Sequence, residues 1–444
     1  MKISKYNHVL PLDSKYSIIY NSVKKTISKI DNRYLDNLNN GTLSKMDIDV
    51  LSKTGIIIPD ITNEESIIAM RHLDDIMSST LDLTIMPTEN CNLRCSYCYE
   101  AFRKGKMSTE SQRIFIKYIK KNLYKYTGLN VSWFGGEPTI AMDVIEKLSK
   151  EMIICCKQRK IPYQAGMTTN GYNLTYDNFC KLLELKVRHF QVTLDGMREY
   201  HDKFKRTINN KPTFDTVFQN LKEIHDKCTR NTFDITIRTN ISIDSLEDIP
   251  KIIKLYHDEF GDDRRFNFYF RPVGNWGGDR VKNISDSVFK KSDYSKVYAK
   301  LAESDLKLNY RMYYLELTKN IDICYASIRN SFIIGSDLQI YKCSVIFDSP
   351  ENQIGFIDDT GKMILDECKM NKWVLTGLKG GNLDKCTGCI LSEPCYNSTC
   401  IADQVRGISN YNCPHMKDGL DSLLLLFSTN ELYCKTYEYT EEVV

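Results

Sequence analysis

The stretch LDLTIMPTENCNLRCSYCYE, residues 81–100, joins an apolar run to three closely spaced cysteines, Cys91, Cys95 and Cys98. The alternation at its start predicts a β-strand over 81–88, so the thiols follow the end of a strand. Thiolates at positions i, i+4 and i+7 of one loop can converge on one metal centre, and cysteine thiolates hold iron–sulfur clusters. Three ligands on a four-iron cluster leave one iron open to a substrate or cofactor. The alternative is a structural zinc site with a remote fourth ligand.

Strand and helix patterns alternate downstream of this stretch. Further strands are predicted at 129–134, 163–169, 188–194, 233–240 and 265–272, with helix-length segments at 109–126, 141–158 and 214–228. Such an order favours parallel strands, with helices on one face of a curved sheet or on both faces of an open one. In barrel-like α/β folds, reactive groups collect after the carboxyl ends of the strands, which is where the cysteines lie.

Composition narrows the classes of protein further. The 444 residues predict two to three domains, and 60 basic against 57 acidic residues give no global indication of a nucleic-acid or membrane partner. No apolar segment has the length of a signal peptide core or a membrane span, so a cytoplasmic protein is expected. In a reducing compartment, 16 cysteines favour metal binding or redox chemistry over disulfides.

The pattern CxxxCx(aromatic)C, which reads here as Cys91, Cys95, Tyr97 and Cys98, resembles that of radical S-adenosylmethionine (SAM) enzymes. The resemblance implies a partial (β/α)6 TIM-like barrel over 80–305, in which the three cysteines hold a [4Fe–4S] cluster and SAM chelates its fourth iron. In that family, one-electron cleavage of SAM gives a 5′-deoxyadenosyl radical that abstracts hydrogen from a substrate. Tyr97 would lie against the adenine.

The segment WFGGEP, residues 133–138, resembles the second signature of the same family. Gly135 and Gly136 allow the backbone to approach a ligand without obstruction by a Cβ atom. Glu137 can accept a hydrogen bond from an ammonium group, and the resemblance implies that this segment holds the amino group of SAM.

Two later segments, at 168–174 and 191–204, resemble the third- and fourth-strand regions of peptide- and protein-modifying members. Thr193 is a candidate contact to the carboxylate or ribose of SAM, and Asn240 closes the fifth strand as a further cofactor contact. Asp195 can form hydrogen bonds in the barrel mouth. His201 is expected to pack or cap a helix, without a catalytic role.

The C-terminal part contains seven more cysteines in a recognisable order: Cys324, Cys343, Cys386, Cys389, Cys395, Cys400 and Cys413. The spacing CxxCx5C within them is a strong ligand signal. The order resembles the SPASM extension of radical SAM enzymes, here 306–444, which binds two auxiliary [4Fe–4S] clusters and brings the total to three. A zinc-stapled small domain is the alternative.

The resemblance implies Cys324, Cys343 and Cys400 for the first auxiliary cluster, and Cys386, Cys389, Cys395 and Cys413 for the second. The first cluster lacks an upstream fourth cysteine, so its fourth position is open, non-cysteine or filled by Cys368. Two departures stand out: Leu338 replaces the usual glycine five residues before Cys343, and Cys395 and Cys400 are separated by four residues instead of three.

Members with both parts modify peptides or proteins, so the expected enzyme is a maturase that installs a thioether or carbon–carbon cross-link in a ribosomal precursor peptide. Its reductant would be a flavodoxin or ferredoxin. An anaerobic sulfatase-maturating enzyme is the alternative, although Ser344 stands where that branch has an aspartate base. A non-catalytic, metal-stapled binding protein is the third. Residues 1–75 form a small separate unit, either a winged-helix element that binds a leader peptide or a scaffold.

Overall fold

The computed structural model describes residues 1–100, 102, 104–261, 263–274, 280–290, 293–318, 323–379, 386, 388–395, 400–408, 413 and 417–439. Within these residues, the central element is a sheet of ten strands in the order β11-β10-β9-β8-β7-β6-β12-β13-β14-β15. A second sheet of four strands and a two-stranded pair belong to the N-terminal unit.

The parallel half of the central sheet contains the predicted strands. They are β6 (Leu81–Ile85), β7 (Leu129–Trp133), β8 (Tyr163–Thr169), β9 (Val187–Thr193), β10 (Asp234–Ile241) and β11 (Phe266–Pro272). Each pairs in parallel with its neighbours in sequence. β6 ends three residues earlier than predicted, close to Pro87, which has no N–H to donate to a ladder.

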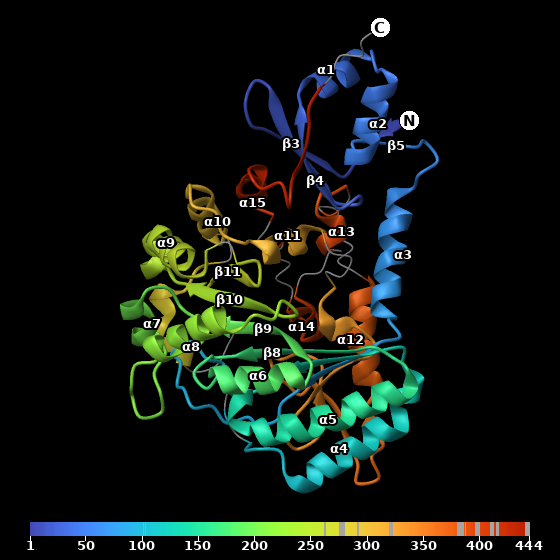
Figure 1. Cartoon of the computed structure of the whole chain (residues 1–444). Coiled ribbons are helices and arrows are strands. Elements are labelled where there is room, and N and C mark those ends of the chain that lie inside the picture. Colours follow the sequence, from blue (N-terminus) through green and yellow to red (C-terminus); the bar gives the residue numbers. More distant parts are fainter. Residues whose placement is uncertain are drawn as a thin grey trace.

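Helices cover one face of these strands, which decides between the two arrangements left open by the sequence (Figure 1). They are α4 (Thr109–Asn122), α5 (Met142–Arg159), α6 (Tyr176–Glu184), α8 (Phe214–Lys227) and α9 (Ile249–Phe260), with α7 (Arg198–Phe204) beside them. The sheet is therefore the curved wall of a partial barrel, with its helices outside, and the predicted fold class is confirmed.

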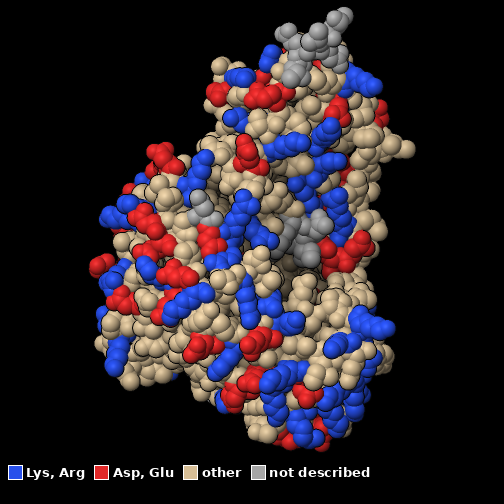
Figure 2. All heavy atoms as spheres, viewed as in Figure 1, with Lys and Arg blue, Asp and Glu red and all other residues tan. Residues whose placement is uncertain are grey.

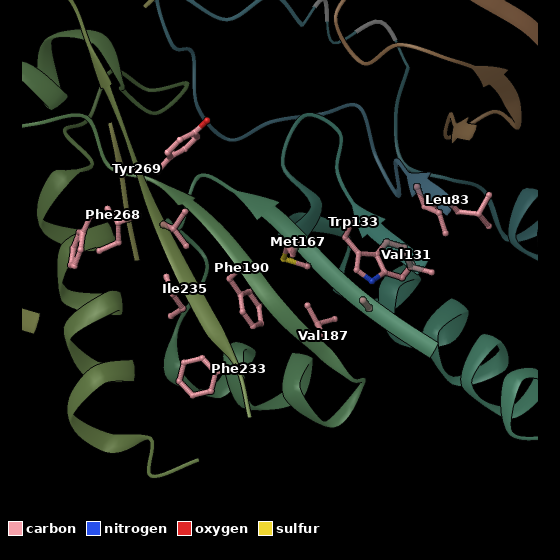
Figure 3. Close-up of a cluster of buried hydrophobic side chains, with 14 of the residues drawn as sticks. Leu83, Val131, Trp133, Met167, Val187, Phe190, Phe233, Ile235, Phe268 and Tyr269 are labelled. Carbon is pink, nitrogen blue, oxygen red and sulfur yellow. The ribbon is translucent and has the colours of Figure 1, made fainter. Parts of the chain in front are cut away.

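Alternation along the strands separates the core from the barrel interior. Ile235 and Ile237 on β10 are fully buried against the helices, together with Phe190 and Phe268 on other strands (Figure 3). Arg238, on the opposite face of β10, lines the interior cavity instead. The helix side is thus a continuous apolar layer, and the concave side is free for polar chemistry.

The C-terminal region extends the same sheet. Its elements are α10 (Ser295–Ala302), α11 (Arg311–Thr318), β12 (Ser331–Ile334), β13 (Gln339–Tyr341), β14 (Gln353–Ile357), β15 (Met363–Leu365), α12 (Glu367–Lys379), α13 (Ser392–Cys395), α14 (Ile401–Val405) and α15 (Leu420–Ser428). β12 pairs in parallel with β6, and β13, β14 and β15 continue antiparallel. The sheet therefore crosses the boundary predicted at 305/306.

The N-terminal unit places most of its strands before its helices. Its elements are β1 (Lys2–Ile3), β2 (Asn7–Pro11), β3 (Tyr16–Asn21), β4 (Thr26–Asp31), α1 (Arg33–Asn40), α2 (Lys45–Thr54), β5 (Ile57–Ile58) and α3 (Glu64–Ile76). A strand from the other end of the chain, β16 (Lys435–Tyr437), completes its sheet in the order β16-β4-β3-β2. Figure 1 shows α3 descending from this unit to the barrel.

A buried ionic contact joins the N-terminal unit to the cysteine-rich region. The carboxylate of Glu393 lies 2.9 Å from Nζ of Lys25 and 3.0 Å from Nη1 of Arg71. His72 on α3 adds a contact of 3.1 Å between its Nε2 and the carbonyl oxygen of Glu393. The segment between Cys389 and Cys395 is thereby fixed against α3.

The surface carries both signs of charge. Figure 2 shows Lys and Arg interspersed with Asp and Glu over the visible face, with basic side chains gathered around the hollow at mid-height. Among the helices of the described residues, none has both the length and the apolarity to cross a bilayer.

Candidate functional site

The three clustered cysteines face one cavity at the carboxyl ends of the barrel strands. Cys91, Cys95 and Cys98 all line this cavity, which has a volume of about 450 Å³. Backbone bonds fix their loop: Arg94 N donates to the carbonyl of Arg206 at 2.8 Å, and Ser96 N donates to that of Phe204 at 3.0 Å. The loop after β6 is therefore held against the segment that follows α7.

Burial makes these thiols hard to ionise without a cation. It raises the pKa of Cys91 to about 11 and that of Cys95 to about 12, with smaller contributions from neighbouring groups that include Cys98. Sγ of Cys91 accepts hydrogen bonds from Leu93 N at 3.4 Å and from Nδ2 of Asn170 at 3.7 Å. Bound iron would stabilise the thiolates because it supplies the missing positive charge.

The three thiols of the cysteine loop face one shared space. Among the described residues, no three His, Cys, Asp or Glu side chains are arranged to hold one metal ion. In a [4Fe–4S] cluster each thiolate binds a different iron, so its ligands surround a larger space. A shared cavity lined by three thiols meets that requirement.

Gly135 and Gly136 follow β7 and touch the start of the cysteine loop. A Cβ atom on Gly135, at φ +123°, would lie 2.3 Å from the carbonyl oxygen of Thr88. A Cβ atom on Gly136 would lie 2.4 Å from the carbonyl oxygens of both Glu89 and Asn90. The close approach that requires glycine here is thus between two protein segments, and it sets the position of the loop.

Glu137 is fully buried and already holds four hydrogen bonds. Its Oε1 accepts from Thr139 N at 3.0 Å, Thr139 Oγ1 at 2.6 Å and Thr169 Oγ1 at 2.7 Å. Its Oε2 accepts from Asn170 N at 2.7 Å. Burial nevertheless raises the pKa of Glu137, because desolvation outweighs these bonds. Glu137 lines the cavity and also ties the turns after β7 and β8 together.

Tyr97, Asp195 and Asn240 form one hydrogen-bonded group. The hydroxyl of Tyr97 donates to Oδ2 of Asp195, and Nδ2 of Asn240 donates to Oδ1 of Asp195 at 3.0 Å. Asp195 N donates to Nδ1 of His201 at 3.0 Å, and Nε2 of His201 contacts Thr213 Oγ1 at 3.0 Å. Burial lowers the pKa of His201 well below its ordinary value. His201 is therefore a neutral packed side chain, as the sequence predicted.

The cavity contains cations that the motifs did not reveal. Nζ of Lys205 lies 3.0 Å from the carbonyl oxygen of Thr193, and its charge acts on Cys95. Lys205 is buried, and no carboxylate among the described residues is within ion-pair distance of it. Arg238 and Arg271 line the far side of the cavity, where Arg271 lies 3.5 Å from Glu316. Lys205 lies directly after the segment 191–204 that the sequence analysis singled out, and none of the three cations was predicted.

The cavity is also lined by a carboxyl group, that of Glu100. Its Oε1 is buried and has no hydrogen-bond partner among the described residues. Burial, assisted by Glu89 and Asp348, raises the pKa of Glu100 to about 8. Ser344 lines the same cavity, and its Oγ contacts the hydroxyl of Tyr325 at 2.8 Å. A serine hydroxyl is not a base at neutral pH, so Glu100 is a candidate acid–base group in this cavity, whereas Ser344 is not.

The C-terminal cysteines fall into two neighbourhoods. The first contains Cys324, Cys343 and Cys400: burial raises the pKa of Cys324 to about 12, and the charges of the other two contribute. The remaining candidate, Cys368, is exposed at the start of α12, and no interaction within the described ranges joins it to Cys324. Cys368 as the fourth ligand of this group stays a prediction.

The second neighbourhood surrounds Lys417. The charges of Cys389, Cys413 and Cys386 raise the pKa of Lys417, and its Nζ lies 3.7 Å from Sγ of Cys413. Cys395 ends the short helix α13 in the same region. Cys386, Cys389 and Cys413 thus act on one lysine, and the division of the cysteines into two ligand sets stays a prediction.

Leu338 adopts the backbone conformation of the glycine that it replaces. Its φ of 67° is left-handed, a region that costs a non-glycine residue about 1–2 kcal/mol. Leu338 N donates to the carbonyl of Gly335 at 3.0 Å, which closes the turn between β12 and β13. The turn before Cys343 therefore keeps its shape, with strain offset by burial of the leucine side chain.

Comparison with known proteins identifies the central part of the chain. Residues 85–255 match the family described as the Radical SAM superfamily. The Fe-coproporphyrin III synthase of Methanosarcina barkeri is 28% identical over 176 residues, which cover 39% of this chain and 40% of the relative. The cysteine-type anaerobic sulfatase-maturating enzyme of Clostridium novyi is 25% identical over 303 residues, which cover 63% of this chain and 77% of the relative.

A solved structure shares the architecture. Native anSMEcpe with bound AdoMet and the Cp18Cys peptide superposes with a TM-score of 0.60 at 18% identity, over 78% of this chain and 96% of that chain. The chain spans less than half of the first curated relative and about three quarters of the second. The likeness in structure establishes the fold.

Proposed function

We propose that this protein is a radical SAM peptide maturase that abstracts hydrogen from a ribosomally made peptide and installs a thioether or carbon–carbon cross-link, because residues 85–255 match the Radical SAM superfamily. The family implies an enzyme that uses SAM and a [4Fe–4S] cluster. The observation that carries the proposal is the shared cavity, which brings together the three thiols, the GGE turn and a buried lysine.

When bound, the cluster and SAM supply a 5′-deoxyadenosyl radical. Cys91, Cys95 and Cys98 would hold the cluster. The backbone at Gly135 and Gly136, with Glu137, would receive the amino group of SAM. Tyr97 would lie against the adenine, and Thr193 and Asn240 would contact the ribose or the methionine part.

Lys205 would meet the carboxylate of SAM. The lysine is buried, its Nζ is directed to the Thr193 carbonyl, and its charge lacks a carboxylate counterpart among the described residues. A buried cation without a counter-ion is costly unless a ligand supplies the opposite charge. The same position close to Cys95 suits a group that binds beside the cluster.

Two auxiliary [4Fe–4S] clusters complete the proposal. Cys324, Cys343 and Cys400 would hold the first, and the second would use Cys386, Cys389, Cys395 and Cys413. They would carry electrons between the substrate and a flavodoxin or ferredoxin. The separation of these cysteines into two neighbourhoods supports the assignment.

A peptide substrate is supported from two directions. The cavity continues past the thiols to Ser344 and Val345 in the C-terminal region, which leaves room for a substrate beside the cofactor. The fold neighbour anSMEcpe binds a peptide together with AdoMet. In the proposed organisation, residues 1–75 bind the leader, 80–305 carry out the radical chemistry, and 306–444 hold the auxiliary clusters.

The second candidate is a sulfatase-maturating enzyme, which the Clostridium novyi relative favours. That branch has an aspartate where this chain has Ser344, so its base would have to be replaced here. Incubation with a CxPxR-bearing peptide distinguishes the two candidates, because only a sulfatase maturase converts the cysteine to formylglycine.

Anaerobic reconstitution tests the proposed function. We expect about twelve irons per chain, four for each cluster, and release of 5′-deoxyadenosine from SAM with dithionite. An iron content of fewer than about eight per chain would contradict the assignment of three clusters. Absence of deoxyadenosine from the fully loaded protein would contradict the radical enzyme itself.

A further inference from the structure

The C-terminal strand β16 occupies an edge of the N-terminal sheet. It lies parallel to β4, with Lys435 opposite Ser28, Thr436 opposite Lys29 and Tyr437 opposite Ile30. Figure 1 shows this segment rising from α15 to the C-terminus, beside β4 and α1. A strand from the far end of the chain therefore fills a position at which an extended peptide can add to a sheet.

Two tyrosines anchor this tail, which we define as residues 435–439. Tyr437 and Tyr439 pack against the small core of the N-terminal unit, which includes Ile30 and Tyr34. Two residues apart on an extended chain, they face the same side. The ring of Tyr439 meets that of Tyr34 edge-on at 5.0 Å, and the guanidinium of Arg33 lies 4.5 Å over it.

Glu438, the residue between the two tyrosines, accepts hydrogen bonds from polar groups of the N-terminal unit. The carboxylate of Glu438 accepts from the hydroxyl of Tyr16 at 2.6 and 2.7 Å and from Nζ of Lys15 at 3.2 Å. Its carbonyl oxygen accepts from the hydroxyl of Tyr34 at 3.0 Å. The edge of β4, together with the side chains of α1 beside it, thus matches an extended aromatic–acidic–aromatic segment. We call this surface the β4 edge site.

The tail is held more weakly than the strands beneath it. It pairs with β4 through three residues, whereas β3 pairs with β4 through six. Lys435, Thr436 and Glu438 are exposed, and the tyrosines are only half-buried. An occupant of this kind can leave without unfolding the sheet, and the edge of β4 would then present unpaired N–H and C=O groups.

The chain just before the tail is anchored independently. Cys434 is buried, and its N–H donates to the carbonyl of Asn430 at 2.9 Å. The ring of Tyr433 lies 4.9 Å from that of Tyr314 on α11. Release of the tail after Cys434 would therefore leave α15 and its packing in place.

We propose that the β4 edge site binds an extended aromatic–acidic–aromatic segment of the substrate peptide, and that the tail occupies this site in cis until that segment displaces it. This inference rests on the proposed function, since it specifies which edge of the N-terminal unit takes the leader, in which direction and with what sequence chemistry. A tethered competitor acts at a local concentration on the order of millimolar, so the tail would set a threshold for substrate binding.

A labelled peptide tests the site directly. The probe is a fluorescein-labelled synthetic peptide of residues 435–444, KTYEYTEEVV, titrated by fluorescence anisotropy against the full chain and against a chain that ends at Cys434. We expect the shortened chain to bind the probe at least about tenfold more tightly than the full chain, because the competing tail is gone. A probe with Tyr437→Ala and Tyr439→Ala should not bind, whereas Thr436→Ala, at an exposed position, should bind as the parent does.

A full-length variant guards against a folding artefact. Glu438→Arg places a cation against Lys15 and should release the tail, so that the full chain gains affinity for the parent probe. Equal binding by the full chain, the shortened chain and this variant would overturn the inference. So would unfolding of the N-terminal unit in the shortened chain, since the tail would then be a permanent strand.

These outcomes are independent of the proposed chemistry. The assay requires neither iron nor SAM, so a chain that binds the probe but releases no deoxyadenosine would refute the enzyme and keep the binding site. A chain that cleaves SAM but fails the binding test would keep the enzyme and refute the site.

Discussion

The hydroxyl of Tyr97 donates a hydrogen bond to Oδ2 of Asp195, which joins the cysteine loop to the end of β9. Oδ1 of the same carboxylate accepts from the backbone N–H and from Nδ2 of Asn240, at 3.1 and 3.0 Å. Asp195 therefore holds three separate segments of the chain around the cavity.

Replacement of the Asp195 carboxylate should lower the free energy of unfolding more than removal of the Tyr97 hydroxyl. Tyr97→Phe removes one hydrogen bond, worth about 1 kcal/mol, whereas Asp195→Asn turns an amide donor toward groups that are themselves donors, at about 1–3 kcal/mol. The midpoints of thermal unfolding should therefore fall in the order wild type, Tyr97→Phe, Asp195→Asn. An Asp195→Asn protein as stable as the wild type would contradict the geometry.

Loss of one thiol from the first group should remove one cluster. Cys95→Ala is expected to lower the iron content by about four per chain and to abolish deoxyadenosine formation, because the remaining thiols cannot hold the cluster. Cys156→Ala, a buried thiol on α5 outside every predicted ligand set, is the matched control and should keep both. If Cys156→Ala lost the same iron, the assignment would be wrong.

Neutralisation of Lys205 should weaken SAM binding. Hydrogen bonds to charged groups contribute about 1.5–3 kcal/mol, so Lys205→Met should raise the Kd for SAM by about tenfold or more. Lys203→Met, on the exposed side of the same segment, should leave the Kd unchanged. Isothermal titration with the reconstituted protein measures both. An unchanged Kd in Lys205→Met would assign the SAM carboxylate to another group.

The contact between α3 and Glu393 should weaken in acid. Burial lowers the pKa of His72 to about 4, against an ordinary value of 6.5. Between these values the unfolded chain binds more protons than the folded one, so stability present above pH 6.5 is lost as the pH falls toward 4. The loss reaches about 2 kcal/mol by pH 5.

A variant without the imidazole isolates this effect. His72→Gln cannot titrate, so its unfolding midpoint should fall less than that of the wild type between pH 7.5 and pH 5. Burial raises the pKa of nearby Asp75 to about 6, which opposes the loss in both proteins, and Asp75 is the more exposed group. Parallel curves for the two proteins would show that His72 is already solvated.

The strained turn at Leu338 should make a glycine variant more stable than an alanine variant. Leu338→Ala loses buried apolar surface, typically about 2–5 kcal/mol, and keeps the left-handed backbone. Leu338→Gly loses slightly more surface and relieves the strain of about 1–2 kcal/mol. We therefore expect the glycine variant to unfold at the higher temperature of the two. The opposite order would mean that the turn relaxes in solution.

Much of the fold was predictable because it depends on local periodicity. Alternation and short apolar runs located β6 to β11, and helical spacing located α4, α5 and α8, because a side chain's environment repeats along each element. Spacing also identified the three loop cysteines, since ligands close in sequence must be close in space. The grouping of the later cysteines rests instead on the resemblance to the SPASM extension, because Cys324, Cys343 and Cys400 are far apart in the sequence.

Other features depend on contacts between distant parts of the chain. The reason for the glycines at 135 and 136 is the backbone at 88–90, which only the folded chain brings within reach. Lys205 and Glu100 are site residues because both line the cavity in the folded chain. The strand β16 belongs to the N-terminal sheet because folding brings residues 435–437 beside β4. The sequence by itself determined which elements form and that three cysteines share the loop after the first barrel strand, because these features follow from neighbours along the chain. Only the tertiary structure decided which charges, carbonyls and edges meet, because those contacts join residues that no local pattern relates.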